Sequence, residues 1–244
     1  MGGAAGGGAR PRLRTRSGGV VARLLLRGRG ASPAGRAPFA VRRSAGARAE
    51  RPADFDYTLE SHADALARAL ESAGVTGAEV IAHSMGGSVA VVLAARHPHL
   101  VSRLVLVDAN LDPLTPTPGA GGSSGIAAYG EAEFLAGGWE EVRDRVGPGW
   151  WSTMRLTGRA ALHRSATHLV RATVPTLREL LVELKIPRTY LLPEADGPLP
   201  GADALTRAGV SVVPVPDCGH NIMLDNPQGF VRATAAALAL PEGI

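Results

Sequence analysis

A serine lies in a tight turn between an apolar segment and a helix-like segment, and this feature restricts the possible folds more than any other. Residues 78–82 are apolar enough for a short buried strand, and residues 85–97 fit a helix. Ala82 and Gly86 provide small side chains two positions before and after Ser84. Such a turn has a strained backbone and brings neighbouring elements close, which requires small residues at these positions. We therefore predict that the Ser84 hydroxyl projects from a strand-to-helix turn at the C-terminal edge of a sheet.

Elsewhere, segments with helical spacing alternate with apolar segments of strand length. Residues 58–73 carry apolar side chains on one helical face and are followed by Gly74, which favours a helix end there. Further strand-like segments lie at residues 104–107, 189–192 and 210–215, and a helix-like segment at 230–240. Strands whose residues are nearly all apolar, and which alternate with helices, are typical of a parallel sheet covered on both faces. The sequence therefore predicts an α/β fold with a mostly parallel sheet flanked by helices.

A segment of different composition separates the strands predicted near residues 107 and 188. Residues 113–125 are rich in Pro, Gly, Ser and Thr, and the part that follows is mostly helix-like. This segment holds the three tryptophans, Trp139, Trp150 and Trp151. They fit either a small core of their own or an apolar lid over a substrate pocket. We expect residues 111–187 to form a helical lid insertion.

Residues 1–53 differ from the rest in charge and composition. They hold 12 basic residues and one acidic residue, a net charge of +11, whereas residues 54–244 carry −7. Ala, Arg, Gly and Pro make up 39 of these 53 residues, too little apolar bulk to offset the entropy of ordering them. We expect poor order here, either as a genuine basic tail or as a coding sequence read from an unsuitable start or frame. Because the remainder is acidic, the net charge of +4 does not indicate nucleic-acid binding.

The sequence predicts neither a membrane span nor an export signal. Its best N-terminal apolar run, residues 20–26, is interrupted by Arg23 and is far shorter than the roughly 20 residues of a span. Cys218 is the only cysteine, so no intramolecular disulfide can form. We expect a cytoplasmic protein without a membrane partner; its oligomeric state is not predicted.

His220 is the best placed of the seven histidines to act as a base for Ser84. It follows the predicted strand of residues 210–215 in a Pro-Asp-Cys-Gly loop and precedes a helix, so it could reach back over the sheet edge. His83 occupies the variable position of the serine turn. No group of His, Cys and acidic residues has the spacing of metal ligands, so we predict no metal and no cofactor.

Two segments resemble a known superfamily, the α/β-hydrolases, and the resemblance covers about residues 54–244. The serine turn with its helix and next strand is VIAHSMGGSVAVVLAARHPHLVSRLVLVDANLDP, and the histidine loop is PDCGHNIMLDNPQGF. The resemblance implies a Ser-His-acid hydrolase with Ser84 as nucleophile and His220 as base.

The resemblance leaves two candidates for the acid that orients His220. Asp196 follows the strand of residues 189–192 in a loop that resembles the superfamily's G-x-x-D, with proline in place of glycine. The order Ser84, Asp196, His220 is also the order of the superfamily. Asp108 is the alternative acid, because some relatives carry it after the preceding strand.

The N-terminal side departs from the superfamily pattern. Met85, as the first residue of its helix, is expected to donate one oxyanion N–H. Residues 24–33 resemble the strand and loop that supply the second donor, which would be the Arg29 N–H, but Arg27 replaces the usual histidine. No convincing apolar strand lies between residues 33 and 54, so the N-terminal strands are predicted to be incomplete.

We therefore expect a hydrolase that cleaves a small or medium apolar ester through an acyl-enzyme on Ser84. Amide, lactone or carbon–carbon bond hydrolysis would use the same residues. The alternative is a catalytically impaired α/β-hydrolase-like protein that lacks a complete N-terminal sheet and oxyanion loop.

Overall fold

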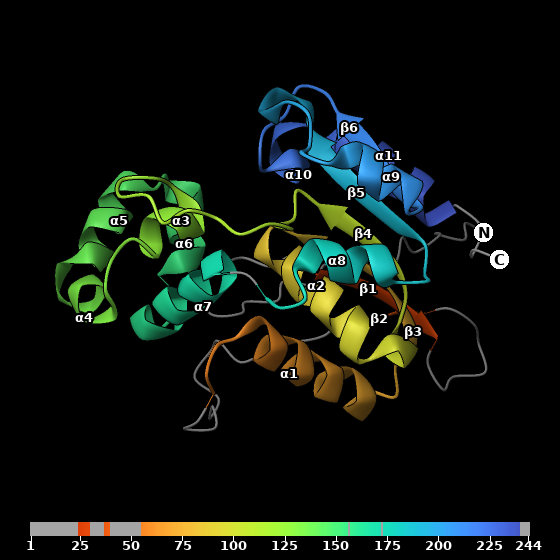
Figure 1. The fold of residues 1–244 in the computed structure, drawn as a ribbon, viewed down its shortest axis with the longest axis horizontal. Coiled ribbons are helices and arrows are strands. Elements are labelled where there is room, and N and C mark those ends of the chain that lie inside the picture. The colour runs from red at the N-terminus through yellow and green to blue at the C-terminus, as the bar shows by residue number, and fades with distance from the viewer. Residues whose placement is uncertain (1–23, 30–36, 40–54, 156, 172, 240–244) are drawn as a thin grey trace, which may run out of the picture.

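The computed structural model describes residues 24–29, 37–39, 55–155, 157–171 and 173–239. Apart from two short strands, the basic region of residues 1–53 lies outside the described residues, and so does the expectation about its order. The predicted α/β architecture is confirmed in the rest (Figure 1).

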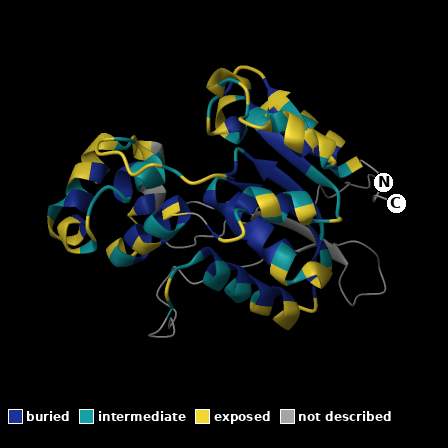
Figure 2. Ribbon diagram, in the orientation of Figure 1, coloured by how far each residue is buried: buried dark blue, intermediate teal, exposed yellow. Residues whose placement is uncertain are grey.

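A six-stranded sheet forms the centre of the molecule, in the order β2-β1-β3-β4-β5-β6. The run from β3 to β6 is parallel, whereas β1 is antiparallel to both of its neighbours. Figure 2 shows β4 and β5 largely buried among helices whose outer sides are exposed. The strands are β1 (Leu24–Arg29), β2 (Ala37–Phe39), β3 (Thr76–His83), β4 (Val101–Val107), β5 (Arg188–Pro193) and β6 (Val210–Val215).

Helices cover both faces of the sheet because successive residues of a strand point to opposite sides. Leu104 and Leu106 of β4 belong to the larger core, whereas Val105 and Val107 belong to a second core on the other face. The larger core packs against α1 (Leu59–Ser72), α2 (Met85–Arg96), α8 (Leu177–Glu183) and α9 (Ala202–Arg207). The second core packs against α10 (Ile222–Asp225) and α11 (Pro227–Ala239).

The segment between β4 and α8 folds into a separate helical group, at the left of Figure 1. It has its own core, in which Phe134, Trp139 and Leu162 are buried and Trp150 and Trp151 pack at its edge. Its members are α3 (Gly122–Ile126), α4 (Glu131–Glu133), the π-helical turn η2 (Phe134–Gly138), α5 (Trp139–Arg145), α6 (Pro148–Met154) and α7 (Arg159–Arg171). We call this group the helical module.

The helical module is smaller than the predicted insertion of residues 111–187. Leu177 and Leu181 of α8 are buried in the larger core of the sheet domain, so α8 belongs to that domain. The three tryptophans lie in or against the core of the module. Whether the module also covers a substrate remains a prediction.

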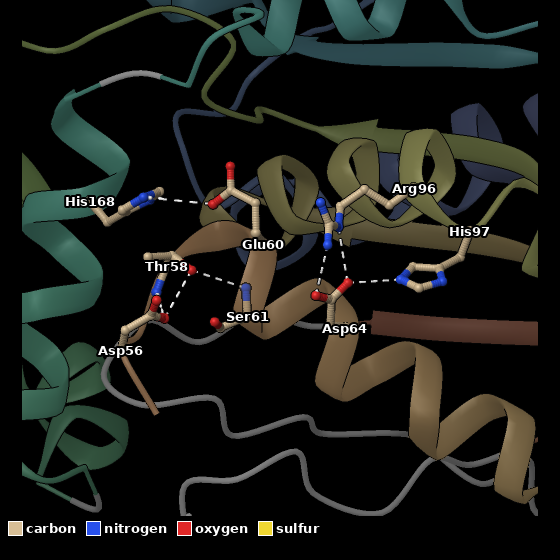
Figure 3. Close-up of polar contacts among 8 residues, drawn as sticks. All are labelled: Asp56, Thr58, Glu60, Ser61, Asp64, Arg96, His97 and His168. Atoms are coloured by element: carbon tan, nitrogen blue, oxygen red, sulfur yellow. Dashed lines mark hydrogen bonds and ion pairs between the residues drawn. The ribbon is translucent and has the colours of Figure 1, made fainter. Parts of the chain in front are cut away.

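Polar contacts join the last helix of the module to α1. The Leu59 N–H donates to Nδ1 of His168, 3.2 Å away, and Nε2 of His168 lies 3.6 Å from Oε2 of Glu60. Nε2 of His62 lies 3.2 Å from Oγ of Ser165. Figure 3 shows His168 beside the first turn of α1. The module is thereby held at the N-terminal end of α1.

Helix α1 is itself anchored at its start and at its middle (Figure 3). Oγ1 of Thr58 accepts the Ser61 N–H at 3.0 Å, which is an N-cap bond, and the Thr58 N–H and hydroxyl donate to Asp56. Further along, Asp64 accepts two hydrogen bonds from Arg96 at the end of α2. The helix predicted for residues 58–73 is therefore confirmed, with Thr58 as its cap.

Candidate active site

Ser84 is the single residue between strand β3 and helix α2. Its φ of 54° and ψ of −133° are rarely adopted by residues with a side chain. The Ser84 N–H donates to the Val107 carbonyl at 3.0 Å, which fixes the turn to the neighbouring strand. Ala82 and Gly86 on either side are buried, as the small residues of this turn led us to expect. The predicted strand-to-helix turn at Ser84 is therefore present.

Ser84 and Asp108 lie side by side at the C-terminal edge of the sheet. His83 and Val107 are partners in the parallel ladder between β3 and β4, so the residue after each occupies the same edge. Asp108, like Ser84, has a positive φ, of 43°. Strand order alone therefore brings a hydroxyl and a carboxylate together.

His220 reaches the same edge from the loop after β6. Its Nδ1 is hydrogen-bonded to Oδ2 of Asp108. The Gly219 N–H donates to Asp225 at 3.1 Å, which holds the loop against α10. Among the described residues, no hydrogen bond joins the Ser84 hydroxyl to the His220 ring; in unliganded enzymes this contact is often loose.

Acidic groups around His220 favour its protonated form. The hydrogen bond to Asp108 raises the pKa of His220 above its usual value near 6.5, and burial of the ring opposes this. The charges of Asp108, Asp196 and Asp225 raise the pKa further. The site therefore stabilises an imidazolium that forms when His220 takes up a proton.

The structure places our first candidate for the acid, Asp196, elsewhere. Asp196 ends the short 3₁₀ helix η3 (Glu194–Asp196) after β5, where its side chain is exposed. It acts on His220 only through its charge, whereas the alternative acid, Asp108, makes the hydrogen bond. The preference for Asp196, which rests on its loop motif, is corrected, because the hydrogen bond to His220 is made by Asp108. Strand order does not explain the difference, because β5, which precedes Asp196, is the neighbour of the histidine strand β6; the observed contact decides it.

Two buried hydroxyls anchor the turn that carries Asp108. The Tyr190 hydroxyl donates to the Ala109 carbonyl at 2.8 Å, and the Ser88 hydroxyl donates to the Asn110 carbonyl at 2.8 Å. The Asp108 N–H donates to the Leu191 carbonyl at 2.9 Å. Burial and the nearby Asp108 raise the pKa of Tyr190, so its hydroxyl stays protonated and remains a donor. The acid is thus presented on a rigid support.

His83, the residue before the nucleophile, is a site residue that the sequence analysis missed. It is buried, and its Nε2 lies 2.8 Å from the His220 carbonyl oxygen. Its ring centroid lies 4.6 Å from that of His220, with the rings tilted by 45°. A histidine next to the nucleophile was the available signal, but only the fold shows what it contacts.

The expected oxyanion donors differ in their placement. Met85 begins α2, so its N–H has no partner within the helix and lies next to Ser84. Arg29 pairs with Thr76 at the start of β3, whereas Ser84 follows the other end of that strand. The prediction that Arg29 supplies the second donor is wrong, because β1 runs antiparallel to β3 and its end lies at the opposite edge of the sheet.

Comparison with known proteins supports the fold. The family model described as the alpha/beta hydrolase fold matches residues 26–123. An esterase from Exiguobacterium antarcticum has a similar structure, with a TM-score of 0.63 and 16% identity over 80% of this chain and 78% of that chain. A thermophilic esterase from Thermogutta terrifontis gives a TM-score of 0.55 and 24% identity over 74% of this chain and 72% of that chain. These structural likenesses show the fold.

Residues 26–123 match the alpha/beta hydrolase family, and the fold is that of the α/β-hydrolases.

Curated proteins similar to this chain are named as hydrolases or as a lipase. The chain is 28% identical over 217 residues to the sn-1-specific diacylglycerol lipase ABHD11 of Mus musculus, covering 78% of this chain and 68% of that protein. A match to 2-hydroxymuconate semialdehyde hydrolase of Pseudomonas sp. (strain CF600) is 40% identical but spans 58 residues, only 20% of that protein. In the described part of the chain, no helix has the length and hydropathy of a membrane span.

Proposed function

We propose that this α/β-hydrolase cleaves a small or medium apolar carboxylic ester through an acyl-enzyme on Ser84. The observation that carries the proposal is the convergence at one sheet edge of a serine on a strained turn and a histidine hydrogen-bonded to a carboxylate. Ser84, His220 and Asp108 are the proposed nucleophile, base and acid. A serine between a strand and a helix, with a base oriented by a third group, is the arrangement that activates a hydroxyl.

In the proposed reaction, Nε2 of His220 removes the proton of the Ser84 hydroxyl as its oxygen attacks the ester carbonyl. Asp108 holds the ring through Nδ1 and stabilises the imidazolium that forms. The Met85 N–H, at the positive end of α2, donates to the carbonyl oxygen as it gains negative charge. His220 then protonates the leaving alcohol, and a water activated by His220 releases the acid from Ser84.

The substrate class rests on the relatives and on the helical module. The named relatives include a diacylglycerol lipase and esterases, all proteins that by name act on ester bonds. The module lies beside the sheet domain and is rich in aromatic residues, which favours an apolar substrate beneath it (Figure 1). The proposed substrate is therefore a small molecule.

The decisive test is covalent labelling of the full chain with a fluorophosphonate probe. We expect stoichiometric labelling of the parent and none of Ser84→Ala, with hydrolysis of short p-nitrophenyl esters lost in the same variant. Ser72→Ala is the control, since Ser72 lies at the exposed C-terminal end of α1 and its hydroxyl is bound to the Arg68 carbonyl. It should still be labelled. If the folded parent is not labelled, the alternative holds, and the chain is a catalytically impaired member of the superfamily.

A further inference from the structure

The residue before the nucleophile is in contact with the proposed base at two points. Nε2 of His83 lies 2.8 Å from the His220 carbonyl oxygen, and the two rings lie with their centroids 4.6 Å apart. His83 is 7% exposed and 49% of the His220 side chain is exposed, so the contact is buried on the His83 side. Its backbone is fixed by the ladder between β3 and β4, where it pairs with Val107.

The hydrogen bond to a carbonyl oxygen shows which ring nitrogen of His83 carries a proton. A carbonyl oxygen only accepts hydrogen bonds, so Nε2 of His83 must carry a proton and donate. The hydrogen bond therefore holds the backbone of residue 220 at a set distance from strand β3. The ring contact limits how the His220 side chain can turn.

We propose that His83 is a positioning residue that sets the place and orientation of the His220 imidazole. The hydrogen bond to the carbonyl holds the loop, and the ring of His83 forms one wall for the ring of His220. Asp108 then needs only to hold the far side, at Nδ1. The role of this contact in turnover rests on the proposed function, but the positioning itself does not.

The chain contains a close control for this contact. His163 of the helical module is 5% exposed, its Nε2 lies 2.8 Å from the Tyr129 carbonyl oxygen, and its ring is near that of Phe134. The same substitution at His83 and His163 removes one part-buried hydrogen bond from a histidine to a backbone carbonyl in each case. Of these two histidines, only His83 contacts His220.

The experiment compares His83→Phe, His83→Gln and His163→Phe in the full chain. Phenylalanine keeps a ring but has no donor, whereas the glutamine amide can donate from a similar reach. The first readout is the pKa of His220, from an NMR titration of its ring protons. The groups that face His220 are Asp108, Asp196, Asp225 and His83, so Asp108→Asn serves as a reference for a lost acid contact.

We expect His83→Phe to lower the pKa of His220, because the ring no longer stays against Asp108. Because the base is then misplaced relative to Ser84, kcat should fall by about 10- to 100-fold with little change in KM. His83→Gln should restore much of both values. His163→Phe should leave the pKa of His220 and kcat as in the parent protein.

The proposal is overturned if His83→Phe has the parent pKa for His220, or if His163→Phe shifts it equally. If His83→Phe does not fold, a parent-like pKa and kcat in His83→Gln support the positioning role, and a pKa as low as in Asp108→Asn contradicts it. Failure of the proposed function gives a different result, namely no labelling of Ser84 while the pKa of His220 still responds to His83.

Discussion

Ser84 and Asp108 both have positive φ values, 54° and 43°, at the ends of neighbouring strands. Such a backbone costs on the order of 1–3 kcal/mol and persists only where the surroundings enforce it. The Ser84 N–H is bound to Val107, and the turn after Asp108 is bound by Tyr190 and Ser88. Strain at both positions is thus offset by hydrogen bonds to buried groups.

The acid at Asp108 leads to a prediction about pH. The base must be neutral to accept the serine proton, so kcat/KM should fall as pH decreases through the pKa of His220. Asp108 holds that pKa above 6.5, so Asp108→Asn should move the acidic limb to lower pH and reduce kcat by about 10⁴-fold. Asp196→Asn should keep a kcat close to the parent value. Profiles of kcat/KM against pH for both variants test this, and the reverse pattern would restore Asp196 as the acid.

The close packing at Gly87 leads to a prediction about stability and activity. A Cβ added at Gly87 would lie 2.4 Å from Cβ of Ala109, so the serine helix and the acid turn touch at this point. Gly87→Ala should lower the free energy of unfolding by about 1–3 kcal/mol and reduce activity, since Ala109 must move and Asp108 with it. Gly137→Ala is the control, because a Cβ there meets nothing within 4 Å. Urea unfolding that ranks the two variants equally would contradict the close approach.

At the scale of elements, helix α1 links the sheet domain to the helical module. Its first turn contacts His168 and Ser165 of α7, and its middle is bound to α2 through Asp64 and Arg96 (Figure 3). Helix α1 is therefore bound both to α2 on the sheet domain and to α7 of the helical module.

The N-cap of α1 can be tested directly. Thr58→Ala removes the acceptor for the Ser61 N–H and should lower the free energy of unfolding by about 1 kcal/mol. Thr58→Ser keeps the hydroxyl and should remain close to the parent. Urea denaturation followed by circular dichroism gives both values. Equal loss in the two variants would mean that the methyl group, not the cap, stabilises this end.

At the scale of the whole molecule, the helical module has a core of its own, and Leu169 of α7 packs instead into the core of the sheet domain. Leu106 is buried in the core of the sheet domain and Leu162 in that of the helical module. We expect each residue to stabilise its own part, because the apolar contacts of the module are largely internal.

Replacing each leucine by alanine separates the two parts. Either change should cost about 2–5 kcal/mol in its own core. Leu162→Ala should expose the module to limited proteolysis between residues 122 and 171 while the sheet domain stays resistant. Leu106→Ala should make the entire described chain sensitive. Cleavage throughout the chain in Leu162→Ala would show that the two parts unfold together.

From Leu59 onward, the sequence by itself determined the type and order of most elements and the place of Ser84. Hydrophobic periodicity, the helix end at Gly74 and the small residues around Ser84 are local properties that do not depend on distant segments. The helix–strand alternation also determined the α/β class.

Only the tertiary structure decided which residues meet at the site. His220 meets Asp108 across 112 positions of the chain, and His83 meets His220 across 137. The direction of β1 moved Arg29 to the opposite edge of the sheet, where it cannot serve Ser84. The physical reason is that strand order, direction and register arise from the packing of the whole core, whereas the loop motif that favoured Asp196 carries no information about distance.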